Sequence, residues 1–144
     1  MTFKRQWPRN LAIAAGYRSG LEESIAARIK DQGLDVLFET DKLSYIVPHR
    51  NSTYTPDFRL PKKGGFWYLE TKGRFTTEAR AKHLLIQGQK PDIDIRFLFQ
   101  NSRAKIYKGS KTRLQDWCDK HGFLWCHKEL PQAWIDECLA ANNQ

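Results

Sequence analysis

The segment from Tyr54 to Gly73 restricts the fold of this chain more than any other. Two runs rich in aromatic and aliphatic residues flank the sequence Lys62-Lys63-Gly64-Gly65. Its glycines supply the positive φ angles that a tight turn between two strands needs. The pattern therefore predicts a β-hairpin whose turn is centred between Lys63 and Gly64.

The register of this hairpin brings two acidic residues together. Asp57 lies opposite Glu70, and directly opposed residues project from the same face with Cβ atoms roughly 5 Å apart. Lys72 returns to the face of Glu70, because side chains alternate along a strand. One face of the hairpin is thus predicted to carry two carboxylates and an ammonium group.

The two opposed carboxylates have two readings. The first is an exposed, solvated hairpin face, which is the usual state of a lone acid pair. The second starts from Phe66 to Leu69, which are typical of a buried strand, where opposed acids destabilise the fold unless a positive charge lies between them. A divalent cation that prefers oxygen ligands fits that place better than Lys72 alone. The order Pro56-Asp57, twelve residues, Glu70-Thr71-Lys72 resembles the PD-(D/E)xK pattern of metal-dependent nucleases.

Length and charge narrow the function classes. The chain has 144 residues, enough for one domain with one hydrophobic core, and a formal net charge of +8. This balance favours a polyanionic partner, with nucleic acid first and an anionic membrane surface second. No apolar run approaches the ~18 residues of a membrane span, and the stretch from Leu11 to Ala15 is too short for a secretory signal. Three cysteines without regular spacing indicate a reducing compartment rather than a disulfide framework.

A zinc site formed by Cys118, His121, Cys126 and His127 is disfavoured. The spacing matches no common zinc pattern, and neighbouring strand residues such as Cys126 and His127 point to opposite faces. Packing in the hydrophobic core is the favoured role of these cysteines.

Periodicity and turn residues predict the remaining elements. Ser19 and Glu22 form a capping box at the start of a helix, and Pro48 is expected to end a strand because it cannot donate to a ladder. Residues 49–53 are expected to form a polar connection into the hairpin. The predicted helices cover residues 19–32, 76–87, 114–121 and a final stretch from Pro131, and the predicted strands cover residues 36–39, 43–47, 94–100 and 123–126. A right-handed crossover joins the hairpin to the strand at 94–100, which predicts an α/β (α+β) fold with a mixed central sheet flanked by helices.

Three basic segments are candidates for contact with a phosphate backbone. Residues 1–17 mix cations with aromatic side chains, as a flexible DNA-binding arm does, although a merely disordered terminus fits equally well. Residues 103–113 hold five cations and a tyrosine in eleven residues. Arg80, Lys82 and His83 offer a third basic surface. For the last two segments the alternative is an ordinary solvated surface.

The sequence resembles the endonuclease I family of junction-resolving enzymes from short-tailed phages. The likeness runs in order from about residue 16 to 136. Its motifs are Tyr17-Arg18-Ser19-Gly20-Leu21-Glu22, Tyr54-Thr55-Pro56-Asp57-Phe58, Leu69-Glu70-Thr71-Lys72-Gly73, Lys82-His83-Leu84-Leu85-Ile86, residues 102–110 and Pro131-Gln132-Ala133-Trp134-Ile135. The N-terminal arm departs from the family pattern, and the basic tail expected in the family does not follow Gln144.

The resemblance implies a nuclease of restriction-endonuclease-like fold that binds four-way (Holliday) and other branched DNA junctions by shape and hydrolyses phosphodiester bonds. Asp57, Glu70 and the main-chain carbonyl of Thr71 would hold one Mg²⁺, for which Mn²⁺ would substitute. Glu22 would join Asp57 at a second metal position. Lys72 would orient or help deprotonate the attacking water, or stabilise the negative charge that develops on the phosphate.

The resemblance also implies an intertwined, domain-swapped homodimer in which residues 46–53 bridge the two protomers. The expected location of the protein is the cytoplasm of a host cell. The predicted DNA-binding residues are Arg18, Arg74, Arg80, Lys82, Arg103, Lys105, Lys108 and Lys111. Two alternatives stay open: a nuclease with the same core that acts on another DNA structure, as restriction and repair enzymes do, and a non-catalytic nucleic-acid-binding module. The presence of Asp57, Glu70 and Lys72 together speaks against the second alternative.

Overall fold

The computed structural model describes residues 16–17 and 19–142. The chain divides into two compact units, Met1–Val36 and Leu37–Gln144, and each is described by itself. That the whole chain works as one nuclease domain stays a prediction. Among the described residues, no helix is both long and apolar enough to cross a membrane.

The first unit contains the helix α2 (Gly20–Asp31). The Ser19 side chain caps it by accepting a hydrogen bond from the Glu22 N–H at 3.2 Å. Gly33 follows the helix with a φ of +79°, a conformation that glycine adopts without strain. The predicted helix and its N-terminal cap are thus confirmed.

A five-stranded mixed sheet forms the centre of the second unit, in the order β1-β4-β5-β6-β7. The strands are β1 (Leu37–Phe38), β4 (Phe58–Lys62), β5 (Gly65–Lys72), β6 (Ile95–Phe99) and β7 (Trp125–His127). β4 and β5 form the predicted hairpin, with Arg59 paired to Tyr68 and Pro61 to Phe66. Gly64 in the turn has a φ of +82°. The predicted register is therefore confirmed.

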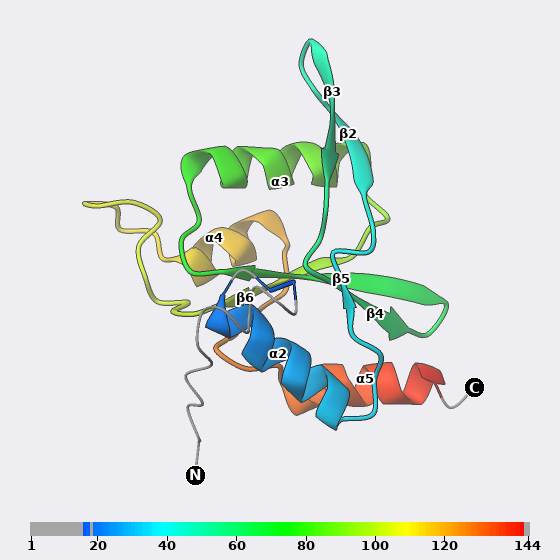
Figure 1. Cartoon of the computed structure of the whole chain (residues 1–144). Coiled ribbons are helices and arrows are strands. Elements are labelled where there is room, and N and C mark those ends of the chain that lie inside the picture. Colours follow the sequence, from blue (N-terminus) through cyan, green and yellow to red (C-terminus); the bar gives the residue numbers. More distant parts are fainter. Residues whose placement is uncertain (1–15, 18, 143–144) are drawn as a thin grey trace. The chain divides into compact units, whose positions relative to one another are not determined.

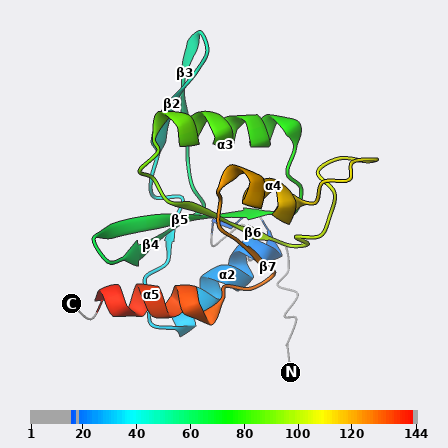
Figure 2. The same cartoon turned by 180° about the vertical axis from the view of Figure 1, so that it is seen from behind.

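The strands β5 and β6 run parallel because the helix α3 (Thr77–Gln89) connects them. Every residue of β6 is buried, as expected for an inner strand of the sheet. α3 and α4 (Leu114–His121) cover one face of the sheet, and α5 (Gln132–Asn142) covers the other (Figure 1 and Figure 2). This arrangement confirms the predicted mixed sheet flanked by helices.

Aromatic side chains fill both interfaces between the sheet and these helices. On the face of α3 and α4, the Phe75 ring packs on Phe97 with ring centroids 5.1 Å apart and against Trp117 at 4.8 Å. On the opposite face, Trp67 of β5 meets Trp134 of α5 at 5.4 Å. Successive residues of β5 thus point to different helices, and Glu70 and Lys72 share the face of Tyr68, toward α3.

The prediction of a polar connection at residues 49–53 is wrong. Residues 50–54 form the strand β3 (Arg50–Tyr54), which pairs antiparallel with β2 (Leu43–Val47) in a separate two-stranded sheet. Pro48 ends β2 as predicted, and His49 turns the chain with a φ of +76°. Pairing with β2 satisfies the backbone of this polar segment, which overrides its weak strand pattern.

Several element boundaries also differ from the prediction, among them the end of α3 and the start of α5. α3 continues through Gly88 to Gln89, whose side-chain amide bonds the main-chain N–H and carbonyl of Ile46. Pro131 precedes α5 instead of occupying its first turn, and its carbonyl accepts from the Trp134 N–H. The contact of Gln89 is distant in sequence, whereas Pro131 accepts a hydrogen bond of the first turn of α5 from the position just before it.

Candidate active site

The acidic residues lie where β4 begins and β5 ends. Asp57 immediately precedes β4, while Glu70 and Lys72 occupy the last part of β5. Both carboxylates are buried, with exposed fractions of 4% for Asp57 and 6% for Glu70. The structure thus brings together the three residues that the hairpin pattern placed on one face.

Asp57 is fixed by the neighbouring strand. Its Oδ2 accepts hydrogen bonds from the Thr71 N–H at 2.9 Å and from the Thr71 hydroxyl at 2.8 Å. Its main-chain carbonyl accepts from the Glu39 N–H at 2.9 Å. These bonds hold the carboxylate beside β5, although Asp57 itself belongs to no helix and has no paired residue in the sheet.

Glu70 is contacted on both of its oxygens. The Tyr54 hydroxyl donates to Oε2, and the Lys72 ammonium lies 3.3 Å from Oε1. Burial raises the pKa of Glu70 to about 7, and the negative charge of Asp57 adds to this effect, whereas Lys72 and the Tyr54 hydrogen bond oppose it. Among the described residues, burial and the charge of Asp57 thus outweigh the opposing effects of Lys72 and Tyr54 on Glu70.

A hard divalent cation fits this donor set. Two buried carboxylates and the main-chain oxygens at the end of β5 are ligands of the kind that Mg²⁺ prefers, and Mg²⁺ commonly keeps waters and substrate phosphates as its other ligands. The described residues contain no cluster of three or more His, Cys, Asp or Glu side chains suited to a metal. Glu22, predicted for a second metal position, belongs to the other compact unit.

Lys82 approaches the same cluster from α3. Its ammonium lies 5.1 Å from the centroid of the Tyr54 ring, the ring whose hydroxyl bonds Glu70. Burial lowers the pKa of Lys82, and so does the positive charge of Lys72, whereas Glu70 and Asp57 raise it. The described structure therefore directs two lysines toward one buried acid pair.

Arg80 and His83 do not form the basic surface that the sequence predicted. The Arg80 guanidinium is buried and donates to the carbonyls of Phe75 and Ile106. His83 has an exposed fraction of 0% and packs edge-on against Phe97. The spacing of Arg80, His83 and Ile86 explains the error, because residues three apart share one helix face and this face meets the sheet.

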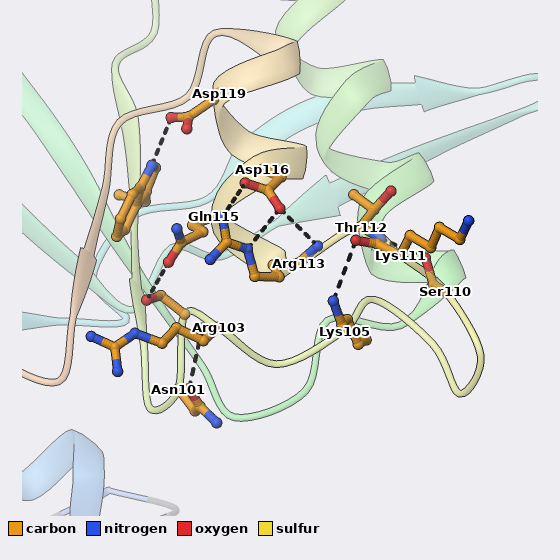
Figure 3. A network of polar contacts seen from close by, with 12 residues as sticks. Asn101, Arg103, Lys105, Ser110, Lys111, Thr112, Arg113, Gln115, Asp116 and Asp119 are labelled. Atoms are coloured by element: carbon orange, nitrogen blue, oxygen red, sulfur yellow. Dashed lines mark hydrogen bonds and ion pairs between the residues drawn. The ribbon is translucent and has the colours of Figure 1, made fainter.

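The predicted basic loop lies at the surface near the end of β5. Arg103, Lys105, Lys108 and Lys111 are exposed, and the Lys105 ammonium donates to the Lys111 carbonyl at 3.4 Å (Figure 3). Arg74, Lys105 and Lys108 line a pocket of about 560 Å³, and Gly73, which follows Lys72, lines it too. Arg113, by contrast, is paired with Asp116 at 2.9 Å. Arg18 and the arm at residues 1–15 lie outside the described residues.

Tyr54 is a site residue that the sequence did not reveal. An aromatic residue in a strand predicts core packing, and Tyr54 is indeed buried. Its hydroxyl reaches Glu70 because β3 ends beside β5, which is a long-range arrangement without a local signal.

Among the residues considered for zinc, the two cysteines are buried in the core and His127 binds a loop. The thiols of Cys118 and Cys126 are buried, which raises the pKa of each to about 12. His127 Nδ1 accepts from the Ser102 N–H at 3.1 Å, an interaction that anchors the start of the basic loop.

Comparison with known proteins identifies the family of this chain. The family model described as phage endonuclease I matches residues 4–143. Endonuclease I of Escherichia phage T7 is 44% identical over 129 residues, which cover 90% of this chain and 85% of the relative. Endodeoxyribonuclease 1 of Enterobacteria phage T3 is 42% identical over 121 residues, which cover 84% of this chain and 78% of the relative.

Proposed function

We propose that this chain, which belongs to the phage endonuclease I family, is a metal-dependent DNA endonuclease that binds four-way and other branched junctions and hydrolyses their phosphodiester bonds. The observation that carries the proposal is the meeting of Asp57, Glu70 and Lys72 at one end of the hairpin. The formal charge of +8 supports a polyanionic substrate. Its place of action would be the cytoplasm of a phage-infected cell.

Asp57, Glu70 and the main-chain carbonyl of Thr71 would hold Mg²⁺, with Mn²⁺ as a substitute, and Glu22 would contribute to a second position. When bound, the ion would supply Lewis-acid stabilisation of the phosphate and a more acidic attacking water. The buried, mutually repelling carboxylates support this assignment, because a cation relieves the repulsion.

Lys72 would act on the water or on the phosphate. Its ammonium contacts Glu70 at 3.3 Å and is partly exposed, so it can reach a substrate beside the acids. From that place it can orient the attacking water or stabilise negative charge on the phosphate in the transition state.

Basic residues near the end of β5 would position the DNA. Arg74, Lys105 and Lys108 line one pocket, and Arg103 and Lys111 extend the charge along the same loop. Their contacts would be to the phosphate backbone, which positions a duplex arm without reading its sequence. Arg18 stays a prediction of the same kind.

We also propose the intertwined homodimer, in which α2 is exchanged between protomers. In support, α2 belongs to a compact unit separate from the one that carries Asp57 and Glu70. Residues 46–53 fold back within one chain as the turn between β2 and β3, and in the proposed dimer they would extend to bridge the two protomers.

A labelled four-way junction tests the activity. The wild-type protein should cut it with Mg²⁺ and only bind it in EDTA, while Asp57→Ala and Glu70→Ala should bind it within a few-fold of wild type without cutting. Affinity should survive because removing acids also removes repulsion of the phosphates. Parallel loss of binding and cutting in a folded variant would contradict the assigned roles.

The same assay with linear duplex as competitor separates the alternatives. A junction-selective enzyme keeps its cleavage rate when unlabelled duplex is added in excess. Equal competition by duplex would favour a restriction-type or repair-type nuclease built on the same core.

A further inference from the structure

Lys82 occupies an unusual place for a surface lysine. It lies in the middle of α3, is half-buried, and its ammonium rests 5.1 Å from the centre of the Tyr54 ring. The same tyrosine donates to Glu70, whose other oxygen contacts Lys72. Tyr54 therefore connects the two lysines through a single carboxylate.

Lys82 is attracted by the charges of Glu70 and Asp57, but it makes no direct bond to either carboxylate among the described residues. Among the described residues, its ammonium has the cation–π contact with Tyr54 but no hydrogen bond or ion pair. A lysine usually extends its ammonium into water when no partner is present, because burying a charge is costly. By comparison, Arg80 on the same helix donates to Phe75 and Ile106. Lys82 is thus held near the acids with donors left for a ligand.

Lys82 is also accessible to such a ligand. It lines an open pocket of about 500 Å³ between α3 and the β2–β3 hairpin, together with Arg50 and Glu78. Asp57 and Glu70 are buried, so the cations of the cluster are its more accessible members. The pocket shows that the Lys82 side chain reaches solvent, although the acids themselves do not line it.

We propose that Lys82 is a second catalytic lysine, which contacts the phosphate that is cut, and that the Tyr54 ring positions its ammonium. This inference rests on the proposed nuclease function. In hydrolysis, a water oxygen bonds to phosphorus and loses its proton to solvent, while the bond from phosphorus to the leaving oxygen breaks and that oxygen takes up a proton. Negative charge accumulates on the phosphate during this exchange, and ammonium groups held close to it stabilise the transition state.

Single-turnover cleavage of the four-way junction provides the first test. Lys82→Gln should slow cutting by at least about tenfold, because it removes a charge that acts most strongly in the transition state. Lys82→Arg should restore most of the rate, since it keeps the charge. Lys63→Gln is the matched control, because Lys63 is exposed at the hairpin turn and loses the same charge.

Binding provides a second test that does not depend on cleavage. Junctions with either a normal phosphate or an uncharged methylphosphonate at the cut position are bound in EDTA by wild type, Lys82→Gln and Lys63→Gln. The methylphosphonate should weaken binding by wild type at least about threefold more than binding by Lys82→Gln. Such a difference shows that Lys82 and the phosphate at the cut position interact directly. The Lys63→Gln protein should respond like wild type.

Three results would overturn the inference. The first is a wild-type cleavage rate in Lys82→Gln, and the second is additive behaviour in the methylphosphonate experiment. The third is an equal loss of rate and thermal stability in Lys82→Gln and Lys82→Arg, which would mark a structural role. Failure of the wild-type protein to cut any junction with Mg²⁺ would instead refute the proposed nuclease function.

Discussion

At the residue scale, Glu70 depends on groups from two different strands. Lys72 follows it on β5, whereas Tyr54 comes from the end of β3. The Tyr54 hydroxyl orients one carboxylate oxygen, so that the other faces Lys72. A ligand for a metal must be held in one orientation before the ion binds, and contacts of this kind commonly set metal affinity.

Tyr54→Phe should therefore raise the Mg²⁺ concentration required for half-maximal cleavage. Loss of the buried donor should also lower the free energy of unfolding by about 1–2 kcal/mol. Tyr68→Phe is the matched control, because the Tyr68 hydroxyl donates to Asp41 at 3.0 Å, away from the acid pair. Tyr68→Phe should lose comparable stability but keep the Mg²⁺ midpoint. An unchanged midpoint in Tyr54→Phe would show that the hydroxyl does not orient Glu70.

His83 gives the fold a dependence on pH. Neither ring nitrogen has a hydrogen-bond partner among the described residues, and burial lowers the pKa of His83 from 6.5 to about 2, with Lys72 and Lys82 adding to the effect. Below pH 6.5, His83 binds a proton in the unfolded chain but stays neutral in the folded chain. This contribution to stability is thus fully present above pH 6.5 and is lost progressively as the pH falls toward 2.

His83→Phe should remove that dependence. Phenylalanine fits among Tyr54, Phe75 and Phe97 and has no polar atom to leave unpaired. The free energy of unfolding of wild type should fall, relative to that of the variant, by about 1.4 kcal/mol for each pH unit below 6.5. Denaturant unfolding at several pH values measures the difference. Parallel curves for the two proteins would show that His83 takes up a proton in the folded state.

The residues that sequence could predict are those with local patterns. Asp57, Glu70 and Lys72 follow from a two-residue period and one turn, and the structure keeps that register. The sequence predicts Lys82 only as a DNA-binding residue and gives no role to Tyr54, because their places beside Glu70 depend on where β3 and α3 pack against β5. Arg80 and His83 were assigned to the surface from their polarity, although their spacing with Ile86 already indicated a buried face.

At the element scale, elements buried in the central sheet were predicted well and solvent-facing ones less well. β6 is apolar throughout, and its type follows from composition. β3 is polar and pairs only with β2, so its sequence resembles a loop. Only the partner strand, which lies outside any local window, makes it a strand.

The basic loop is the element whose role depends most on charge. Lys105→Gln, Lys108→Gln and Lys111→Gln together should weaken junction binding and lower the salt dependence of log K by roughly one unit for each lost phosphate contact. A control triple, Lys30→Gln, Lys63→Gln and Lys120→Gln, removes the same charge from exposed positions in α2, the β4–β5 turn and α4. Binding measured across a salt series gives both slopes. If the slope of log K against log salt concentration changes equally in both variants, the loop makes no specific contact with the phosphate backbone.

At the scale of the whole molecule, the predicted catalytic residues are distributed over the two compact units. Glu22 lies on α2 in the first unit, and Asp57, Glu70 and Lys72 lie in the second. The same sequence is compatible with a site completed within one chain and with a site shared by two chains. The local sequence patterns do not differ between these two arrangements. Only an experiment that labels the chains separately distinguishes the two arrangements.

Mixed dimers provide that experiment. Glu22→Ala and Asp57→Ala subunits with different tags are co-expressed and purified through both tags, because an intertwined dimer exchanges subunits slowly once folded. In the swapped arrangement both lesions fall in one site and the other site is intact, so a supercoiled plasmid with an extruded cruciform should be nicked but not linearised. In the unswapped arrangement each site carries one lesion and neither cuts. Nicked circles from the mixed dimer, with both parent homodimers inactive, would establish the shared site, whereas an inert mixed dimer or a monomeric protein would exclude it.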